Sequence, residues 1–113
     1  MACKCCSNDF DDYQRWTGRF VKYARYENVE RKMYPALGLA GETGEVCEKI
    51  KKEFRDGELD AEGLKLELGD VLWYLARVAA EYGFSLGDVA MSNVEKLEGR
   101  RERGTLQGSG DKR

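Results

Sequence analysis

Apolar residues recur every three or four positions along four stretches of the chain, the spacing typical of helices that each bury one side. The predicted helices, with Asn8 or Asp9 as the first cap, cover residues 9–26, 34–55, 60–82 and 86–103. Asp56-Gly57 and Gly83 suit the ends of the second and third helices, and Ser85 suits the start of the fourth. No stretch alternates with the period of a strand and no segment repeats, so we expect an all-α fold.

The helices expected at 34–55 and 60–82 each separate into an apolar side and a charged side at about 100° per residue. The apolar sides, expected to face the core, contain Ala36, Leu39, Ala40, Val46, Cys47, Ile50 and Phe54, then Leu64, Leu68, Val71, Leu72, Leu75 and Ala79. In the fourth helix the inward residues are Leu86, Ala90, Val94 and Leu97. Gly38, Gly41 and Gly44 weaken the second helix by about 0.8 to 1 kcal/mol each relative to alanine, so we expect a backbone or a ligand to approach closely there.

The composition bounds the class of protein. A chain of 113 residues makes one domain with a modest core, expected here over residues 9–104, with disordered tails at 1–8 and 105–113. The net charge of −2 offers no general attraction to nucleic acid or to an anionic membrane, and no apolar run reaches the roughly 20 residues that span a bilayer. Without a signal-peptide pattern, we expect a cytoplasmic protein.

Two pairs of acidic residues lie three positions apart on consecutive predicted helices. These are Glu42 with Glu45, and Glu67 with Asp70. One such pair usually lies on a solvated surface, but two antiparallel helices could direct all four carboxylates to one place. Their mutual repulsion is tolerable only with a bound cation or shared protons, and the hard ion that favours oxygen ligands is Mg²⁺. Because the chain contains no histidine, chemistry that needs an imidazole is excluded.

The fourth predicted helix carries a cationic stripe. Its members are Asn93, Lys96, Arg100 and Arg103. Such a stripe alone is usually just solvated, but cations near metal-binding carboxylates are what a polyphosphate substrate requires. Tyr74, one turn after Asp70, could either stack on a base or pack in the core.

At these residues the chain resembles the MazG-like all-α nucleoside triphosphate pyrophosphohydrolases, whose superfamily also contains dimeric dUTPases, dCTP pyrophosphatases and phosphoribosyl-ATP pyrophosphohydrolases. The resemblance covers residues 10–104 and rests on three segments, Gly38-Leu-Ala-Gly-Glu-Thr-Gly-Glu-Val, Glu67-Leu-Gly-Asp-Val-Leu-Trp-Tyr-Leu and Asn93-Val-Glu-Lys-Leu-Glu-Gly-Arg100. Gly41 stands where the fullest form of the first motif has an additional acid.

The resemblance implies a four-helix-bundle-like fold that assembles as a homodimer or homotetramer. It also implies hydrolysis of a (d)NTP to the (d)NMP and pyrophosphate, with a house-cleaning role in the nucleotide pool. The implied ligands of Mg²⁺, or of Mn²⁺, are Glu42, Glu45, Glu67 and Asp70. The candidate contacts to phosphates are Lys49, Lys52, Asn93, Lys96 and Arg100, and those to base and sugar are Gln14, Thr17 and Tyr74.

Two other interpretations remain open at this point. The chain could be a non-catalytic helical module for oligomerisation or metal binding that keeps the fold, although such a module should have lost part of the acid quartet. It could also be an enzyme of the same family that acts on phosphoribosyl-ATP.

Overall fold

The computed structural model describes residues 9–26 and 30–113, and this part of the chain is all-helical. The elements are α1 (Phe10–Thr17), the 3₁₀ turns η1 (Gly18–Phe20) and η2 (Tyr23–Arg25), α2 (Met33–Asp56), α3 (Ala61–Glu81) and α4 (Leu86–Arg103). The predicted all-α class is therefore confirmed. None of the described helices is both long enough and apolar enough to cross a membrane.

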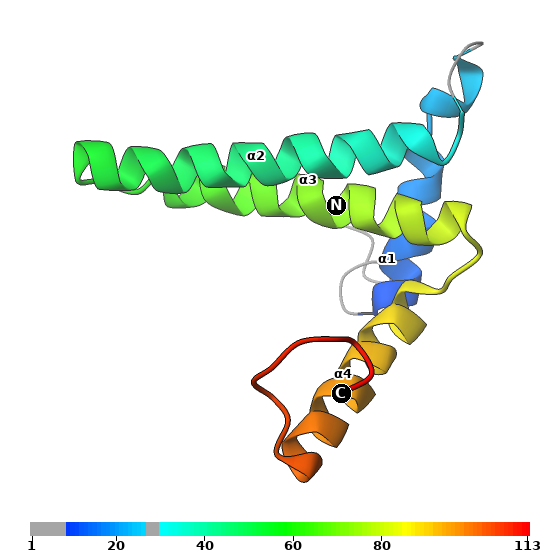
Figure 1. Cartoon of the computed structure of the whole chain (residues 1–113). Helices are drawn as coiled ribbons and strands as arrows, with labels where there is room; N and C mark the ends of the chain where they lie inside the picture. Colours follow the sequence, from blue (N-terminus) through cyan, green and yellow to red (C-terminus); the bar gives the residue numbers. More distant parts are fainter. Residues whose placement is uncertain (1–8, 27–29) are drawn as a thin grey trace.

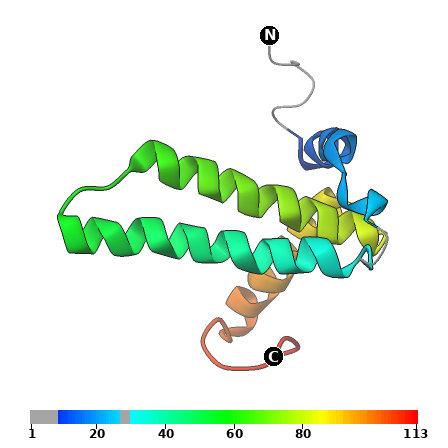
Figure 2. The same ribbon diagram turned by 90° about the horizontal axis from the view of Figure 1, so that it is seen from above.

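The two long helices form an antiparallel hairpin, and the other two are attached at one end of it. Figures 1 and 2 show α2 and α3 side by side along their lengths, with α1 crossing near the end of α3 that leads into α4. From there α4 projects away from the hairpin, so the four helices of one chain do not close into a bundle. The predicted bundle-like arrangement is thus not made within a single chain.

Local signals place the helix ends within about two residues of the prediction for α2, α3 and α4. The Asp60 carboxylate accepts a hydrogen bond from the Gly63 N–H at 2.9 Å and caps α3, and the Ser85 hydroxyl accepts from the Asp88 N–H at 3.1 Å and caps α4. Gly57 and Gly104 end α2 and α4 with φ of 81° and 70°, a conformation that favours glycine.

The first helix is much shorter than predicted, because the α-helix ends at Thr17 and not near Tyr26. Beyond Gly18 the chain continues through the two 3₁₀ turns and bends back toward the end of α3. The bend buries the ring of Tyr23, which is only 2% exposed and whose hydroxyl donates to Glu81 Oε1 at 2.8 Å. This long-range contact overrides the helical periodicity that the sequence carries through residue 26.

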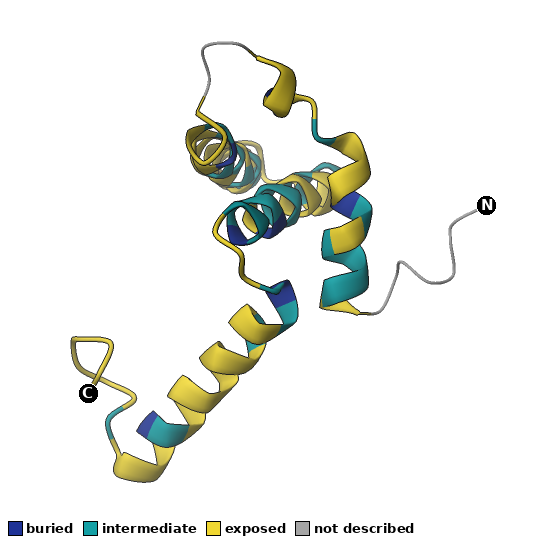
Figure 3. Cartoon of the chain, turned by 90° about the vertical axis from the view of Figure 1, so that its right-hand side faces the viewer, coloured by how far each residue is buried: buried dark blue, intermediate teal, exposed yellow. Residues whose placement is uncertain are grey.

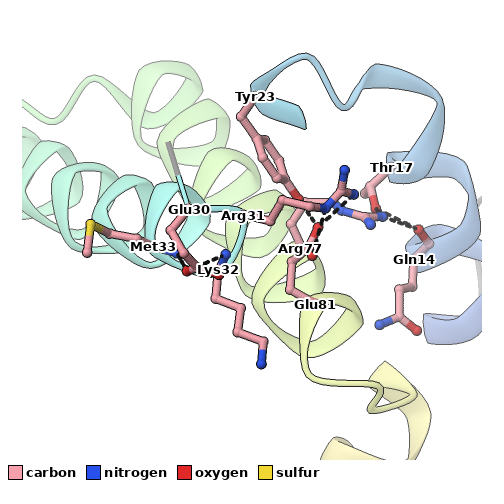
Figure 4. Close-up of polar contacts among 9 residues, drawn as sticks. All are labelled: Gln14, Thr17, Tyr23, Glu30, Arg31, Lys32, Met33, Arg77 and Glu81. Carbon is pink, nitrogen blue, oxygen red and sulfur yellow. Dashed lines mark hydrogen bonds and ion pairs between the residues drawn. The ribbon is translucent and has the colours of Figure 1, made fainter. Parts of the chain in front are cut away.

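A charged cluster at the end of α3 fixes this connection. Glu81 accepts hydrogen bonds from the Tyr23 hydroxyl and from the Arg31 guanidinium, at 3.2 Å to Oε1 and 3.3 Å to Oε2 (Figure 4). Burial alone would raise the pKa of Glu81, but the hydrogen bonds from Arg31 and Tyr23 outweigh it and lower that pKa below its ordinary value.

The predicted core stripe of α2 is wrong for the isolated chain. Five of its seven members are exposed: Ala36, Ala40, Cys47, Ile50 and Phe54. Phe54 is 85% exposed, whereas the remaining two members, Leu39 and Val46, are half-buried. They share the inward side of α2 with Gly38, Glu42 and Lys49. Among the described residues the buried apolar side chains are those of Tyr23 in η2, Pro35 in α2, Ala76 and Ala79 in α3, and Leu86 in α4. Figure 3 shows that α4 is exposed over most of its length.

The apolar residues left outside lie together. On α3 the predicted core residues Leu68 and Leu75 are 51% and 37% exposed, and on α4 Val94 and Leu97 are 51% and 42% exposed. At 100° per residue, the exposed apolar residues of α2 form one arc on the surface of that helix, and those of α3 form another. Each arc lies roughly a quarter turn from the side where the two helices meet. Because the helices are antiparallel, both arcs face the same side of the hairpin.

The predicted C-terminal tail, residues 105–113, contains no further helix and loops back beside α4 (Figure 1). The Arg113 guanidinium donates hydrogen bonds to the carbonyls of Thr105, Leu106 and Gly110. The predicted N-terminal tail, residues 1–8, lies outside the described residues.

Glu81→Gln should make stability depend less on pH. The pKa of Glu81 is lowered by folding, so its contribution is fully present above the unfolded pKa and is lost as pH falls through the folded one. We expect the substitution to reduce the free energy of unfolding by roughly 1 to 3 kcal/mol at pH 7 and by much less near pH 3. Urea unfolding at both pH values measures this. Glu95→Gln, on an exposed position of α4, is the control, and an equal loss at both pH values would contradict the assignment.

Candidate metal site

Three carboxylates from α2 and α3 converge at the interface of the hairpin. Glu42 comes from α2, while Glu67 and Asp70 lie one turn apart on α3. One oxygen from each lies within 4.8 Å of the other two. Ligand oxygens of an octahedral Mg²⁺ at about 2.1 Å are separated by roughly 3 to 4 Å, so small side-chain adjustments would let all three bind one ion.

Glu45, the fourth acid of the predicted quartet, does not join this group. It lies one turn after Glu42 but is exposed, and the convergent set contains only the other three acids. It remains close enough for its negative charge to contribute to raising the pKa of Glu42. The structure therefore brings together three of the four predicted ligands and leaves Glu45 at their edge.

The negative charges of these acids make the ionised form of Glu42 less favourable. Burial raises the pKa of Glu42 most, followed by the negative charges of Asp70 and Glu67 and a hydrogen bond shared with Glu67. The raised pKa means that ionised Glu42 is held in an unfavourable environment, which a cation would relieve. An all-oxygen donor set of this kind fits a hard divalent ion such as Mg²⁺ or Mn²⁺.

Aromatic side chains stand next to the acids. A cavity of about 320 Å³ is lined by Glu42, Asp70, Trp73 and Tyr74, and the two rings meet edge to face with their centroids 5.1 Å apart. Tyr74 was predicted as a candidate contact, whereas Trp73 was missed. Its position directly before Tyr74, in a segment that also carries Asp70, is the signal that could have identified it.

Tyr13 of α1 is a second neighbour that the sequence did not reveal. Burial raises its pKa most, and the charge of Asp70 raises it further, which places the phenol near that carboxylate. Nothing in the spacing of α1 relates Tyr13 to Asp70, which is far away in the sequence.

The two lysines predicted on α2 occupy different surroundings. Lys49 forms an ion pair with Asp60 at 2.9 Å, and the pKa of its amine is raised first by that contact and then by the charges of Glu67 and Glu45. It therefore lies beside the acid site. Lys52 is exposed, and its charge lowers the pKa of Glu48 and of Asp56 instead.

Gln14 and Thr17, predicted as base or sugar contacts, are engaged in holding α1 against the rest of the chain. The Gln14 amide donates to the carbonyls of Ala76 and Phe84, at 3.2 and 2.9 Å, and accepts from the Leu86 N–H at 3.0 Å. Thr17 is 0% exposed, and its hydroxyl accepts from Arg77 at 3.0 Å while donating to the Gln14 carbonyl (Figure 4). The polar groups of both side chains are thus already bonded inside the protein, and their contact with a base or sugar stays a prediction.

The predicted phosphate contacts on α4 lie away from the acids of the same chain, since α4 diverges from the hairpin (Figure 1). The Arg100 guanidinium is 6% exposed and donates to the carbonyls of Gly110 and Asp111, at 3.1 and 3.0 Å. The Lys96 amine lies 3.7 Å from the Asp111 carboxylate, and Lys96 and Asn93 also line a cavity of about 490 Å³ at the start of α4.

Comparison with known proteins shows which family this chain is similar to. The model of the MazG nucleotide pyrophosphohydrolase domain matches residues 33–105, which contain α2, α3 and α4. The Gene 37 protein of Mycobacterium phage L5 is 42% identical over 92 residues, which cover 77% of this chain and 81% of that protein. No solved structure matches the chain.

Glu42→Gln should stabilise the protein in the presence of a chelator. Because folding raises the pKa of Glu42, its ionised form is disfavoured at neutral pH, so neutralising the side chain removes a repulsion. We expect a higher melting temperature than wild type at pH 7 and a smaller difference near pH 4. Glu48→Gln is the matched control on the same helix. The Glu48 carboxylate pairs with Lys51 at 2.8 Å, so this change should leave the melting temperature equal or lower. A fall in melting temperature for Glu42→Gln would contradict the repulsion.

Proposed function

This chain belongs to the MazG nucleotide pyrophosphohydrolase domain family, and we propose that it is a Mg²⁺-dependent enzyme that hydrolyses a (d)NTP to the (d)NMP and pyrophosphate. The observation that carries this proposal is the convergence of carboxylates from both acidic motifs at the α2–α3 interface. A role in cleansing the nucleotide pool accords with such an activity.

Glu42, Glu67 and Asp70 are the residues that hold the divalent ion, and Glu45 is near enough to join them through a side-chain rotation. When bound, the ion supplies neutralisation of the phosphate charge and a lowered pKa of water, chemistry that a chain without histidine otherwise lacks. Mn²⁺ can replace Mg²⁺ in an all-oxygen site. A non-catalytic relative would not need to retain this convergence of acids.

The nucleotide lies against the cavity next to the acids. Trp73 and Tyr74 form its aromatic wall and are placed to contact the base or the sugar. Lys49, already beside the acids, and the exposed Lys52 contribute positive charge toward the phosphates. Lys96 and Asn93 come from α4 of a neighbouring subunit, because α4 of the same chain points away. The Arg100 guanidinium joins them only by leaving the carbonyls of Gly110 and Asp111, to which it is bonded.

A homodimer or homotetramer is the proposed assembly. Its support is the apolar side of the hairpin, where Phe54, Ile50 and Leu68 are 85%, 39% and 51% exposed. Covering such side chains stabilises by about 25 cal/mol for each Å² of apolar surface removed from water. A second copy, carrying the same surface, can pack against it and complete the four-helix arrangement that one chain does not form.

Activity is tested by incubating the protein with each of the eight common (d)NTPs and phosphoribosyl-ATP, with Mg²⁺ or with a chelator. We expect pyrophosphate and a monophosphate as the products, only with the metal. Glu67→Gln and Asp70→Asn should lower kcat by at least about a hundredfold while leaving the circular dichroism unchanged. Glu95→Gln, on α4, is the matched control. Release of orthophosphate alone would refute the proposed cleavage, and turnover of phosphoribosyl-ATP alone would assign that substrate instead.

The proposed assembly is tested by sedimentation velocity at micromolar concentration, where the wild type should be a dimer or larger. Replacing Ile50 and Phe54 together by glutamate places two charges on the apolar side and should yield a monomer with a lower melting temperature. Lys52→Glu, on the charged side of the same helix, should leave the assembly intact. A monomeric wild-type protein would show that the apolar side has another use.

A further inference from the structure

One contact between α2 and α3 is made possible by the absence of a side chain. Gly38 lies one turn before Glu42 on α2, and Tyr74 lies one turn after Asp70 on α3. A methyl group on Gly38 would lie less than 3.0 Å from the Cδ1, Cε1 and Cζ atoms of the Tyr74 ring. The ring thus occupies the space that any other residue at position 38 would fill with its own Cβ.

The ring has little freedom to move without disturbing the acid site. Trp73 packs against it edge to face, with centroids 5.1 Å apart and planes at 83°. The cavity that Tyr74 lines is the one bordered by Glu42 and Asp70. A Cβ on residue 38 would therefore either push the ring into that cavity or force α2 and α3 apart, and both displacements change the positions of the carboxylates.

We propose that Gly38 is a positioning residue of the metal site: it admits the Tyr74 ring into the α2–α3 interface and so sets the separation at which Glu42 meets Glu67 and Asp70. This inference rests on the proposed function, because it takes the three acids as the ligands of the metal. Three other helical glycines near the acids differ in this respect, since a methyl group on Gly41, Gly44 or Gly69 would meet no neighbouring atom within 4 Å.

The difference between these glycines provides the experiment. In an exposed helix interior Gly→Ala is favourable, and Gly44→Ala and Gly69→Ala should raise the melting temperature by about 3 to 6 °C with unchanged affinity for Mn²⁺. Gly38→Ala gains the same helix propensity but meets the Tyr74 ring. We expect its melting temperature to be unchanged or lower, and its Mn²⁺ dissociation constant, measured by calorimetry well below the melting temperature, to rise about tenfold or more.

Combining Gly38→Ala with changes at Tyr74 separates positioning from a general loss of stability. In a Tyr74→Ala background the clash is absent, so adding Gly38→Ala should raise the melting temperature and leave the Mn²⁺ affinity of that background unchanged. In a Tyr74→Phe background the ring remains, so Gly38→Ala should still weaken Mn²⁺ binding and should not raise the melting temperature. If Tyr74→Ala does not fold, the comparison of Gly38→Ala with Gly44→Ala still tests whether Gly38 positions the metal site.

Each outcome has a definite meaning. A Gly38→Ala protein that melts higher by as much as Gly44→Ala and binds Mn²⁺ as wild type does would overturn the inference. Wild-type protein that binds no Mn²⁺ would overturn the proposed metal site, and the positioning role with it. Normal Mn²⁺ binding with the expected pattern among the variants, but no pyrophosphate release from any nucleotide, would overturn the proposed activity and leave the positioning role of Gly38 standing.

Discussion

The feature on which the rest of this structure depends is the meeting of acidic side chains inside a helix–helix interface. Glu42 of α2 faces Glu67 and Asp70 of α3 where a helical hairpin would ordinarily bury an apolar stripe. Like charges that share a partly desolvated site raise one another's pKa, as Glu42 shows, and such a site is stable only when a cation or a proton compensates it. Binding of the proposed metal ion would therefore stabilise the hairpin and couple folding to the proposed chemistry.

Directing the acids inward has a consequence for the opposite side of the hairpin. Many of the apolar residues of α2 and α3 that were expected in the core are instead exposed, among them Phe54 at 85% and Leu68 at 51%. The buried core of the described chain is small and includes Tyr23, Pro35, Ala76, Ala79 and Leu86. A chain built in this way exposes an apolar surface along its hairpin, which agrees with the proposed assembly and with a site that draws its α4 cations from a partner.

Polar contacts hold that junction in place and thereby position the walls of the site. Gln14 bonds to the backbone at both the end of α3 and the start of α4, and the pairing of Thr17 with Arg77 adds a buried contact to α1. These bonds keep α1 where Tyr13 comes near Asp70. The polar groups of Gln14 and Thr17 thus serve to fix the helix that borders the acids.

The sequence by itself determined the helices and their order, because helix periodicity and capping are local: Asp60, Ser85 and the glycines at 57 and 104 act within a turn of the chain. It also predicted that Glu42, Glu45, Glu67 and Asp70 lie together, since residues one turn apart share a helix face and antiparallel neighbours bring two faces into contact. Three of these acids do converge, and only the tertiary structure left Glu45 outside the group. Only the tertiary structure decided which face of α2 turns inward, because an amphipathic pattern shows that two sides differ but not whether a chain buries the apolar one alone or with a partner. The tertiary structure also decided that α1 ends at Thr17, that Gln14 is hydrogen-bonded inside the protein, and that the ring of Tyr74 lies against Gly38. Each of these features depends on residues that are distant in the sequence.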